Sequence, residues 1–148
     1  MLMLATPADS HALGQRLAAV VRPGDAIALS GPLGAGKTSV ARGLLAGLGL
    51  AGEAPSPTFA IVQPYAPPEV RVPVLHVDAY RLRDPAEAEE LGLDEARSDS
   101  VLIVEWPERL DARLLDDALW LALAPLPAGG RALTWQVPAA WDGRWPPQ

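Results

Sequence analysis

The segment from Gly31 to Thr38 (Gly-Pro-Leu-Gly-Ala-Gly-Lys-Thr) carries the residue types that bind a phosphate group. It fits the pattern G-x-x-x-x-G-K-[ST] at every fixed position. Its glycines allow consecutive backbone N–H groups to converge on phosphate oxygens, and a helix that starts here adds the positive end of its dipole. Lys37 would place a compact charge between the β- and γ-phosphates, and the Thr38 hydroxyl suits a magnesium ion. The segment predicts a nucleotide phosphate loop, with an ordinary glycine turn as the alternative.

Lys37 is the only lysine in the chain, against eleven arginines, and there is no asparagine. A lysine at this one position fits a site that needs a flexible point charge, where a planar guanidinium would not fit. GTPases usually recognise guanine through an N-K-x-D segment, which this composition rules out. By elimination, ATP is the predicted nucleotide.

Two carboxylates follow apolar runs. Glu105 ends the run Val101–Val104, and Asp78 follows another apolar stretch. Ligands of α/β folds bind at the carboxyl ends of the strands. Glu105 is therefore expected to hold a magnesium-bound water, and Asp78 to orient the attacking water or complete the magnesium shell. The alternatives are that Glu105 simply ends a strand and that Asp78 pairs with Arg81 or Arg83.

Three further positions have weaker signals. Thr58, in Ser-Pro-Thr, follows the predicted phosphate-loop helix, where P-loop GTPases carry a threonine that senses the γ-phosphate. A proline-stiffened loop is the alternative. Trp106, beside Glu105, is a core residue, a surface near the nucleotide, or an anchor for a partner. His76 is interpreted as a packed strand residue rather than a ligand.

The surrounding pattern alternates strands with helices, as needed to position these groups. Ala26–Ser30 predicts a buried strand that enters the loop, and a helical pattern follows from Lys37 to about Leu48. Further predicted elements are helices over Thr6–Val21 and Pro85–Leu91, and strands over Phe59–Gln63, Val70–Val77, Val101–Val104, Leu119–Leu123 and Ala132–Val137. This order predicts an α/β layer fold whose late strands form an antiparallel edge.

The 148 residues suit one domain, 1–148, in which 141–148 form a frayed tail or an irregular strap. The absence of cysteine excludes disulfides and thiolate metal sites. The formal charge of −6 argues against a broad nucleic-acid footprint of the chain's own. There is neither a signal-peptide pattern nor a run of about 18 apolar residues, so a cytoplasmic protein is expected.

Four segments occur in order over Gly31–Glu108: Gly-x-Leu-Gly-Ala-Gly-Lys-Thr, Ser-Pro-Thr-Phe, His-x-Asp-x-Tyr-Arg-Leu and Val-Glu-Trp-Pro-Glu. Together they resemble the bacterial TsaE (YjeE) family. The resemblance implies a P-loop NTPase three-layer sandwich with a mixed, mostly parallel central sheet and an antiparallel C-terminal edge. It also implies a weak, magnesium-dependent ATPase with ATP and Mg²⁺ as cofactors.

The same resemblance implies a biological role. The family acts with the proteins TsaD and TsaB in the threonylcarbamoyl modification of adenosine 37 of tRNA, and its ATP hydrolysis resets that complex. Contact with tRNA would come only through the complex, and no membrane is involved.

By position, the resemblance implies that Asp78, Lys37 and Glu105 are catalytic and that Thr38 and Glu105 serve magnesium. The implied nucleotide contacts are Gly31, Leu33, Gly34, Ala35, Gly36, Lys37, Thr38, Ser39, Thr58, Trp106, Glu108 and Gly130. The segment around Pro7 is a further candidate.

Two other functions remain open for a P-loop chain. A small-molecule or nucleotide kinase normally needs an acceptor-binding insertion and an arginine-bearing lid, for which this chain has no room. A nucleotide-gated scaffold would bind ATP and a partner with negligible turnover. Hydrolysis stimulated by TsaB and TsaD would favour the ATPase, and phosphate transfer to a nucleoside or sugar would favour the kinase.

Overall fold

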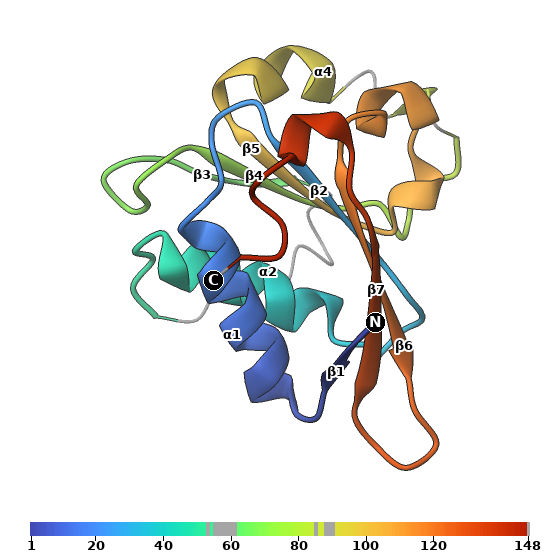
Figure 1. Ribbon diagram of the computed structural model, residues 1–148. Coiled ribbons are helices and arrows are strands. Elements are labelled where there is room, and N and C mark those ends of the chain that lie inside the picture. Colours follow the sequence, from blue (N-terminus) through green and yellow to red (C-terminus); the bar gives the residue numbers. More distant parts are fainter. Residues whose placement is uncertain (53, 55–61, 85, 88–90, 148) are drawn as a thin grey trace.

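A computed structural model of the chain describes residues 1–52, 54, 62–84, 86–87 and 91–147. Within these residues, seven strands form one sheet in the order β1-β7-β6-β2-β5-β4-β3 (Figure 1). The strands are β1 Leu2–Leu4, β2 Ala26–Ser30, β3 Val62–Tyr65, β4 Val74–Asp78, β5 Val101–Glu105, β6 Leu119–Pro125 and β7 Arg131–Gln136. The four central strands, β6, β2, β5 and β4, are parallel, whereas the pairs β1–β7, β7–β6 and β4–β3 are antiparallel.

The predicted α/β class and mixed sheet with a parallel centre are confirmed. The hairpin β6–β7 is antiparallel, as expected of the late strands. The outermost strand on that side, however, is the N-terminal β1. No strand was predicted there, because three residues are too few to show an alternating pattern. The strand predicted over Val70–Val77 begins later, at Val74.

The helices and helical turns are α1 Pro7–Ala18, α2 Lys37–Gly47, α4 Leu93–Ala96 and 3-10 turns at Arg97–Asp99, Pro107–Arg109, Ala112–Leu115 and Ala139–Trp141. Helix α1 begins after Thr6 because Thr6 and Asp9 form a reciprocal capping box: the Thr6 hydroxyl accepts from Asp9 N at 3.2 Å, and Asp9 Oδ2 accepts from Thr6 N at 3.1 Å. None of the described helices is long and apolar enough to cross a bilayer.

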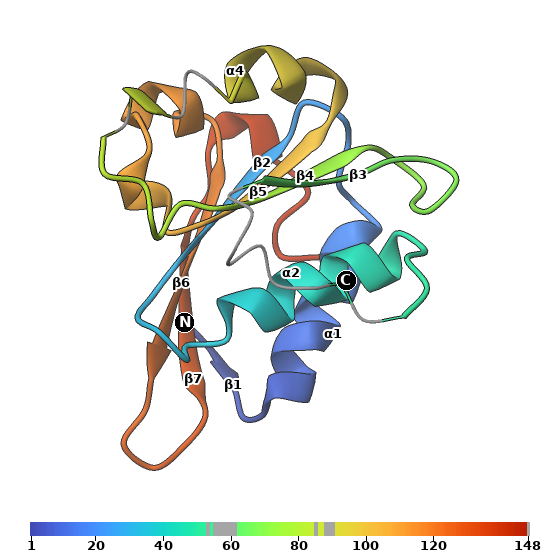
Figure 2. The same cartoon turned by 180° about the vertical axis from the view of Figure 1, so that it is seen from behind.

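The central strands bury side chains on both faces of the sheet, which is why they read as continuous apolar runs. On one face, Ile27 and Leu29 of β2 join a core with α1 and α2. On the other, Ala26 and Ala28 join a second core that includes Leu93 of α4 and residues of the 3-10 turns. Figures 1 and 2 show α1 and α2 side by side against the sheet.

Helices α1 and α2 approach each other backbone to backbone. A Cβ atom at Gly14 of α1 would overlap the carbonyl oxygen of Val40, and one at Gly43 of α2 would overlap that of His11. Only glycine permits this contact, because any side chain would push the helices apart. The pair therefore holds the start of α1 close to the start of α2.

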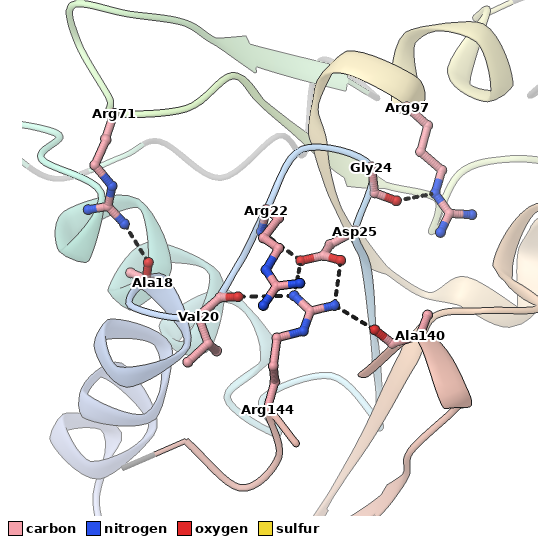
Figure 3. A network of polar contacts seen from close by, with 9 residues as sticks. All are labelled: Ala18, Val20, Arg22, Gly24, Asp25, Arg71, Arg97, Ala140 and Arg144. Atoms are coloured by element: carbon pink, nitrogen blue, oxygen red, sulfur yellow. Dashed lines mark hydrogen bonds and ion pairs between the residues drawn. The ribbon is translucent and has the colours of Figure 1, made fainter. Parts of the chain in front are cut away.

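The described part of the C-terminal segment, called the strap below, packs against the rest of the chain. Trp141 is fully buried. Arg144 reaches Asp25, just before β2, with two bonds of 2.6 and 2.9 Å, and it also donates to the carbonyls of Val20 and Ala140 (Figure 3). The strap is thus attached to the chain at the amino end of β2.

Two predicted elements fall partly on residues outside the described part of the chain. The strand over Phe59–Gln63 is described from Val62 onward, and the acidic helix over Pro85–Leu91 only at 86–87 and 91. Asp84 Oδ1 does accept a hydrogen bond from Ala86 N at 2.9 Å, the contact expected of the cap that starts such a helix.

Candidate functional site

The loop between β2 and α2 contains glycines in left-handed backbone conformations. Gly31 has φ 142° and Gly36, the residue that caps α2, has φ 101°. A side chain at Gly31 would also overlap the carbonyl oxygen of Leu123 in the neighbouring strand β6. The loop therefore needs glycine at Gly31 for two reasons, backbone conformation and close packing. Helix α2 begins at Lys37, directly after the last glycine of the loop.

The Lys37 side chain is folded back over its own loop. Its ammonium group donates to the carbonyl oxygens of Gly31 and Pro32, the latter at 3.1 Å, and it lies 4.0 Å from the ring centroid of Trp106. Burial lowers the pKa of Lys37 from its ordinary value, although the charges of Glu105, Glu108 and Asp78 act in the opposite direction. The Lys37 ammonium is thus partly desolvated and contacts two carbonyls and an aromatic ring.

Glu105 is held between two side chains at the end of β5. Its Oε1 accepts from the Thr38 hydroxyl at 2.8 Å, and its Oε2 lies 2.7 Å from His76 Nε2. Glu105 is 3% exposed and His76 is fully buried. The predicted metal residues Thr38 and Glu105, which are 67 positions apart in sequence, are therefore in direct contact.

Asp78 and Trp106 stand beside this pair. Asp78 is opposite Glu105 in the register of β4 and β5, and its Oδ1 accepts from Tyr80 N at 3.0 Å. Trp106 has φ 62°, the only positive φ of a non-glycine residue in the described part of the chain. This turn leads the backbone sharply away from β5, and the Trp106 ring lies 5.0 Å, centroid to centroid, from that of Tyr80.

These groups surround a cavity of about 420 Å³. Among the predicted residues, those that line it are Leu33, Gly34, Ala35, Gly36, Lys37, Thr38, Ser39, Asp78, Glu105, Trp106 and Gly130, together with Pro7. Gly31 acts through its carbonyl, which holds Lys37, and Glu108 through its charge on Lys37. Thr58 lies outside the described residues. The assignment of nucleotide contacts to these residues stays a prediction.

Arg131, at the start of β7, is a cavity residue that the sequence interpretation missed. Its Nε donates to Ala35 O at 3.1 Å and its Nη2 to Gly34 O at 2.7 Å, so its guanidinium supports the tip of the phosphate loop. Its position after the turn Gly129-Gly130 was the only available signal. Ser10, Tyr80 and Arg81 also line the cavity without having been predicted there.

The residues present fit a magnesium site of one particular kind. No group of three or more His, Asp or Glu side chains suited to a metal occurs in the described part of the chain. Mg²⁺, however, usually takes only one or two protein oxygens and fills its shell with water and substrate phosphates. Thr38 Oγ1 and Glu105 Oε1, 2.8 Å apart at the start of α2, match that requirement.

The sequence model of the family described as threonylcarbamoyl adenosine biosynthesis protein TsaE matches residues 4–131. A tRNA threonylcarbamoyladenosine biosynthesis protein TsaE of Streptomyces coelicolor is 48% identical over 112 residues, which cover 75% of this chain and 76% of that protein. The protein of the same name from Bacillus subtilis is 37% identical over 118 residues, 79% of this chain and 72% of that protein. The crystal structure of Bacillus subtilis YdiB superposes with a TM-score of 0.77 and 28% identity, over 94% of this chain and 85% of the other. The match covers the phosphate loop, both strand-end carboxylates and Arg131, and on this evidence the chain belongs to the TsaE family.

Proposed function

We propose that this chain binds ATP with Mg²⁺ in the cavity at the start of α2 and hydrolyses it in the service of tRNA threonylcarbamoyladenosine biosynthesis. One observation carries the proposal: a phosphate loop, a buried lysine and a Thr38–Glu105 pair surround the same cavity. The P-loop NTPase fold, with α1 and α2 on one side of the sheet and short helices on the other, is part of this proposal.

Each group has a definite task in this function. The backbone N–H groups of the loop and the N-terminus of α2 receive the phosphates. Lys37 exchanges its bonds to Gly31 O and Pro32 O for phosphate oxygens. Thr38 and Glu105 hold Mg²⁺, which when bound neutralises charge on the phosphates.

Asp78 would orient the attacking water. One of its carboxylate oxygens accepts from Tyr80 N, and a carboxylate has a second oxygen that can accept a hydrogen bond from water. Trp106 and Tyr80, whose rings contact each other, line the cavity beside it.

The relatives' names connect them to one tRNA modification pathway. By family resemblance we propose TsaD and TsaB as partners, a cytoplasmic location, and hydrolysis that resets the complex. Slow turnover of the isolated chain is expected from the same resemblance.

The test measures binding of ATP, ADP and GTP by calorimetry with and without Mg²⁺, and ATP hydrolysis with and without TsaB and TsaD. We expect preferential binding of adenine nucleotides and partner-stimulated hydrolysis. The variant Glu105→Ala should lose turnover more than nucleotide affinity, and equal loss of both would contradict its magnesium role. Phosphate transfer to a nucleoside or sugar would support the kinase alternative, and partner binding without hydrolysis the scaffold.

A further inference from the structure

His76 is a buried titratable side chain to which the proposed function gives no task. It lies in the middle of β4, and its partner Ile103 precedes Glu105 by two residues on the neighbouring strand β5. His76 and Glu105 are therefore diagonal neighbours on one face of the sheet. His76 Nε2 lies 2.7 Å from Glu105 Oε2, on the side of the carboxylate opposite to Thr38.

The chemistry of the pair defines which atom carries the hydrogen. An ionised carboxylate can only accept, so His76 Nε2 must donate to Glu105. The other ring nitrogen, Nδ1, is buried and has no hydrogen-bond partner in the described part of the chain. A hydrogen on Nδ1 would be buried without an acceptor, which is unfavourable. The geometry therefore assigns a hydrogen to Nε2, which donates it to Glu105.

We propose that His76 is a positioning residue: it holds the Glu105 carboxylate so that Oε1 faces Thr38 and the magnesium position. The effect of this positioning on magnesium rests on the proposed function, whereas the hydrogen bond between His76 and Glu105 does not. Without the Nε2 donor, Glu105 Oε2 would be buried with an unmet acceptor, and the carboxylate would turn toward other donors. Lys37, whose ammonium is influenced by the charge of Glu105, is one candidate.

A residue that merely fills space would behave differently under substitution. The amide nitrogen of glutamine reaches about as far as His Nε2 and can donate in its place, whereas leucine fills similar volume without a donor. The matched pair His76→Gln and His76→Leu thus separates hydrogen bonding from packing. Both variants are first compared with wild type by thermal unfolding.

The decisive readout is the dependence of ADP affinity on Mg²⁺, measured by calorimetry without any turnover. Mg²⁺ should increase the ADP affinity of His76→Leu by a factor about 10- to 100-fold smaller than in wild type, as is typical when the support of a metal ligand is removed. Its affinity for ADP without Mg²⁺ should stay near that of wild type. His76→Gln should restore the Mg²⁺ effect. A leucine variant with the full Mg²⁺ effect, or a glutamine variant as impaired as leucine, would overturn the inference.

A second measurement needs no substitution and also covers a leucine variant that fails to fold. Two-bond ¹H–¹⁵N correlation spectra of histidine-labelled wild-type protein report the tautomer of His76 directly. A hydrogen on Nε2 supports the inference, and a ring that carries its only hydrogen on Nδ1 overturns it. If wild-type protein shows no Mg²⁺-dependent nucleotide binding, the proposed function fails, and the spectrum still decides the hydrogen bond.

Discussion

The two ends of the parallel strands both bury charge, but they use it in different ways. At the amino end of β2, Asp25 receives two bonds from the Arg144 guanidinium and a third from Arg22 N (Figure 3), and none of these residues lines the cavity at the start of α2. At the carboxyl end, Lys37 and Glu105 are equally buried, yet both line a cavity of about 420 Å³.

The difference teaches how a buried charge can be assigned to folding or to binding. Burying an ion is costly unless its partners are complete. A planar guanidinium meets both oxygens of Asp25, so that pair is complete within the chain. Lys37 instead contacts two carbonyls and an aromatic ring, and burial lowers its pKa. The first arrangement is complete within the fold, and the second agrees with the ligand role proposed for Lys37.

The largest expected effect is on stability. Arg144→Ala leaves Asp25 buried without its countercharge and should lower the free energy of unfolding by about 3–5 kcal/mol, as measured by urea denaturation. ATP affinity should be unchanged at a temperature where the variant is folded, because the pair lies at the far end of β2. The matched control is Arg113→Ala, which breaks an exposed pair with Asp111 and should leave stability close to wild type. Equal destabilisation by both variants would contradict the distinction.

The second effect is on binding. Lys37→Ala removes the charge at the phosphates and should weaken ATP affinity by about 10- to 100-fold, the range for a hydrogen bond to a charged group. Stability should not fall, since the buried ammonium is desolvated in the folded chain. Calorimetric titration with ATP tests the affinity, and a thermal melt tests the stability. A variant that melts at a lower temperature but binds ATP as tightly as wild type would invert the comparison.

Arg131→Ala should weaken ATP affinity by about tenfold, because the carbonyls of Gly34 and Ala35 lose the donors that hold the loop tip. Arg131→Lys should recover little, since an ammonium cannot bridge two carbonyls with the geometry of a guanidinium. Nucleotide titrations of both variants measure the loss. Full affinity in Arg131→Ala would show that the loop keeps its shape without this support.

The smallest effect concerns Tyr65, opposite Val74 at the closed, amino end of the strands. Its hydroxyl is buried and has no hydrogen-bond partner among the described residues, so Tyr65→Phe should raise stability by up to about 1 kcal/mol. Burial, followed by the charge of Glu69, raises the pKa of Tyr65 above its ordinary value of 10.0.

The pH dependence of this effect follows from the direction of the shift. The folded state disfavours ionised Tyr65, whereas the unfolded chain ionises it freely. The free energy of unfolding is therefore unaffected by this group at neutral pH and falls as the pH rises above about 10. Wild-type protein should therefore lose stability relative to Tyr65→Phe between pH 9 and 11, roughly the range of tyrosine ionisation. If the stability of both proteins changed equally over this pH range, the hydroxyl would be solvated and the prediction wrong.

Much of the fold could be predicted because local patterns encode it. The bounds of β2 and β5 agree with the apolar runs that end on Ser30 and Glu105, and α2 starts at Lys37 as its motif requires. Strand β1 could not be found in this way, since its only support is pairing with β7 more than 100 residues later. Short elements that exist through tertiary pairing leave little local trace.

The same division holds for the site. The motif identified Lys37 and Thr38, and the ends of the apolar strands identified Asp78 and Glu105. The structure places all four residues around one cavity. Arg131 and the contact between His76 and Glu105 depend on which strands lie side by side, and one sequence does not contain that information. His76 was correctly interpreted as packed in a strand, but its hydrogen bond was not foreseen.

The glycine contacts between α1 and α2 have a consequence for the pocket itself. Thr6, Pro7 and Ser10, at the start of α1, line the same cavity as the start of α2. Gly14 and Gly43 determine how near the two helices can come, so they also affect the spacing of the two parts of the cavity wall that these helices supply. The width of the cavity thus depends on two glycines that do not line it.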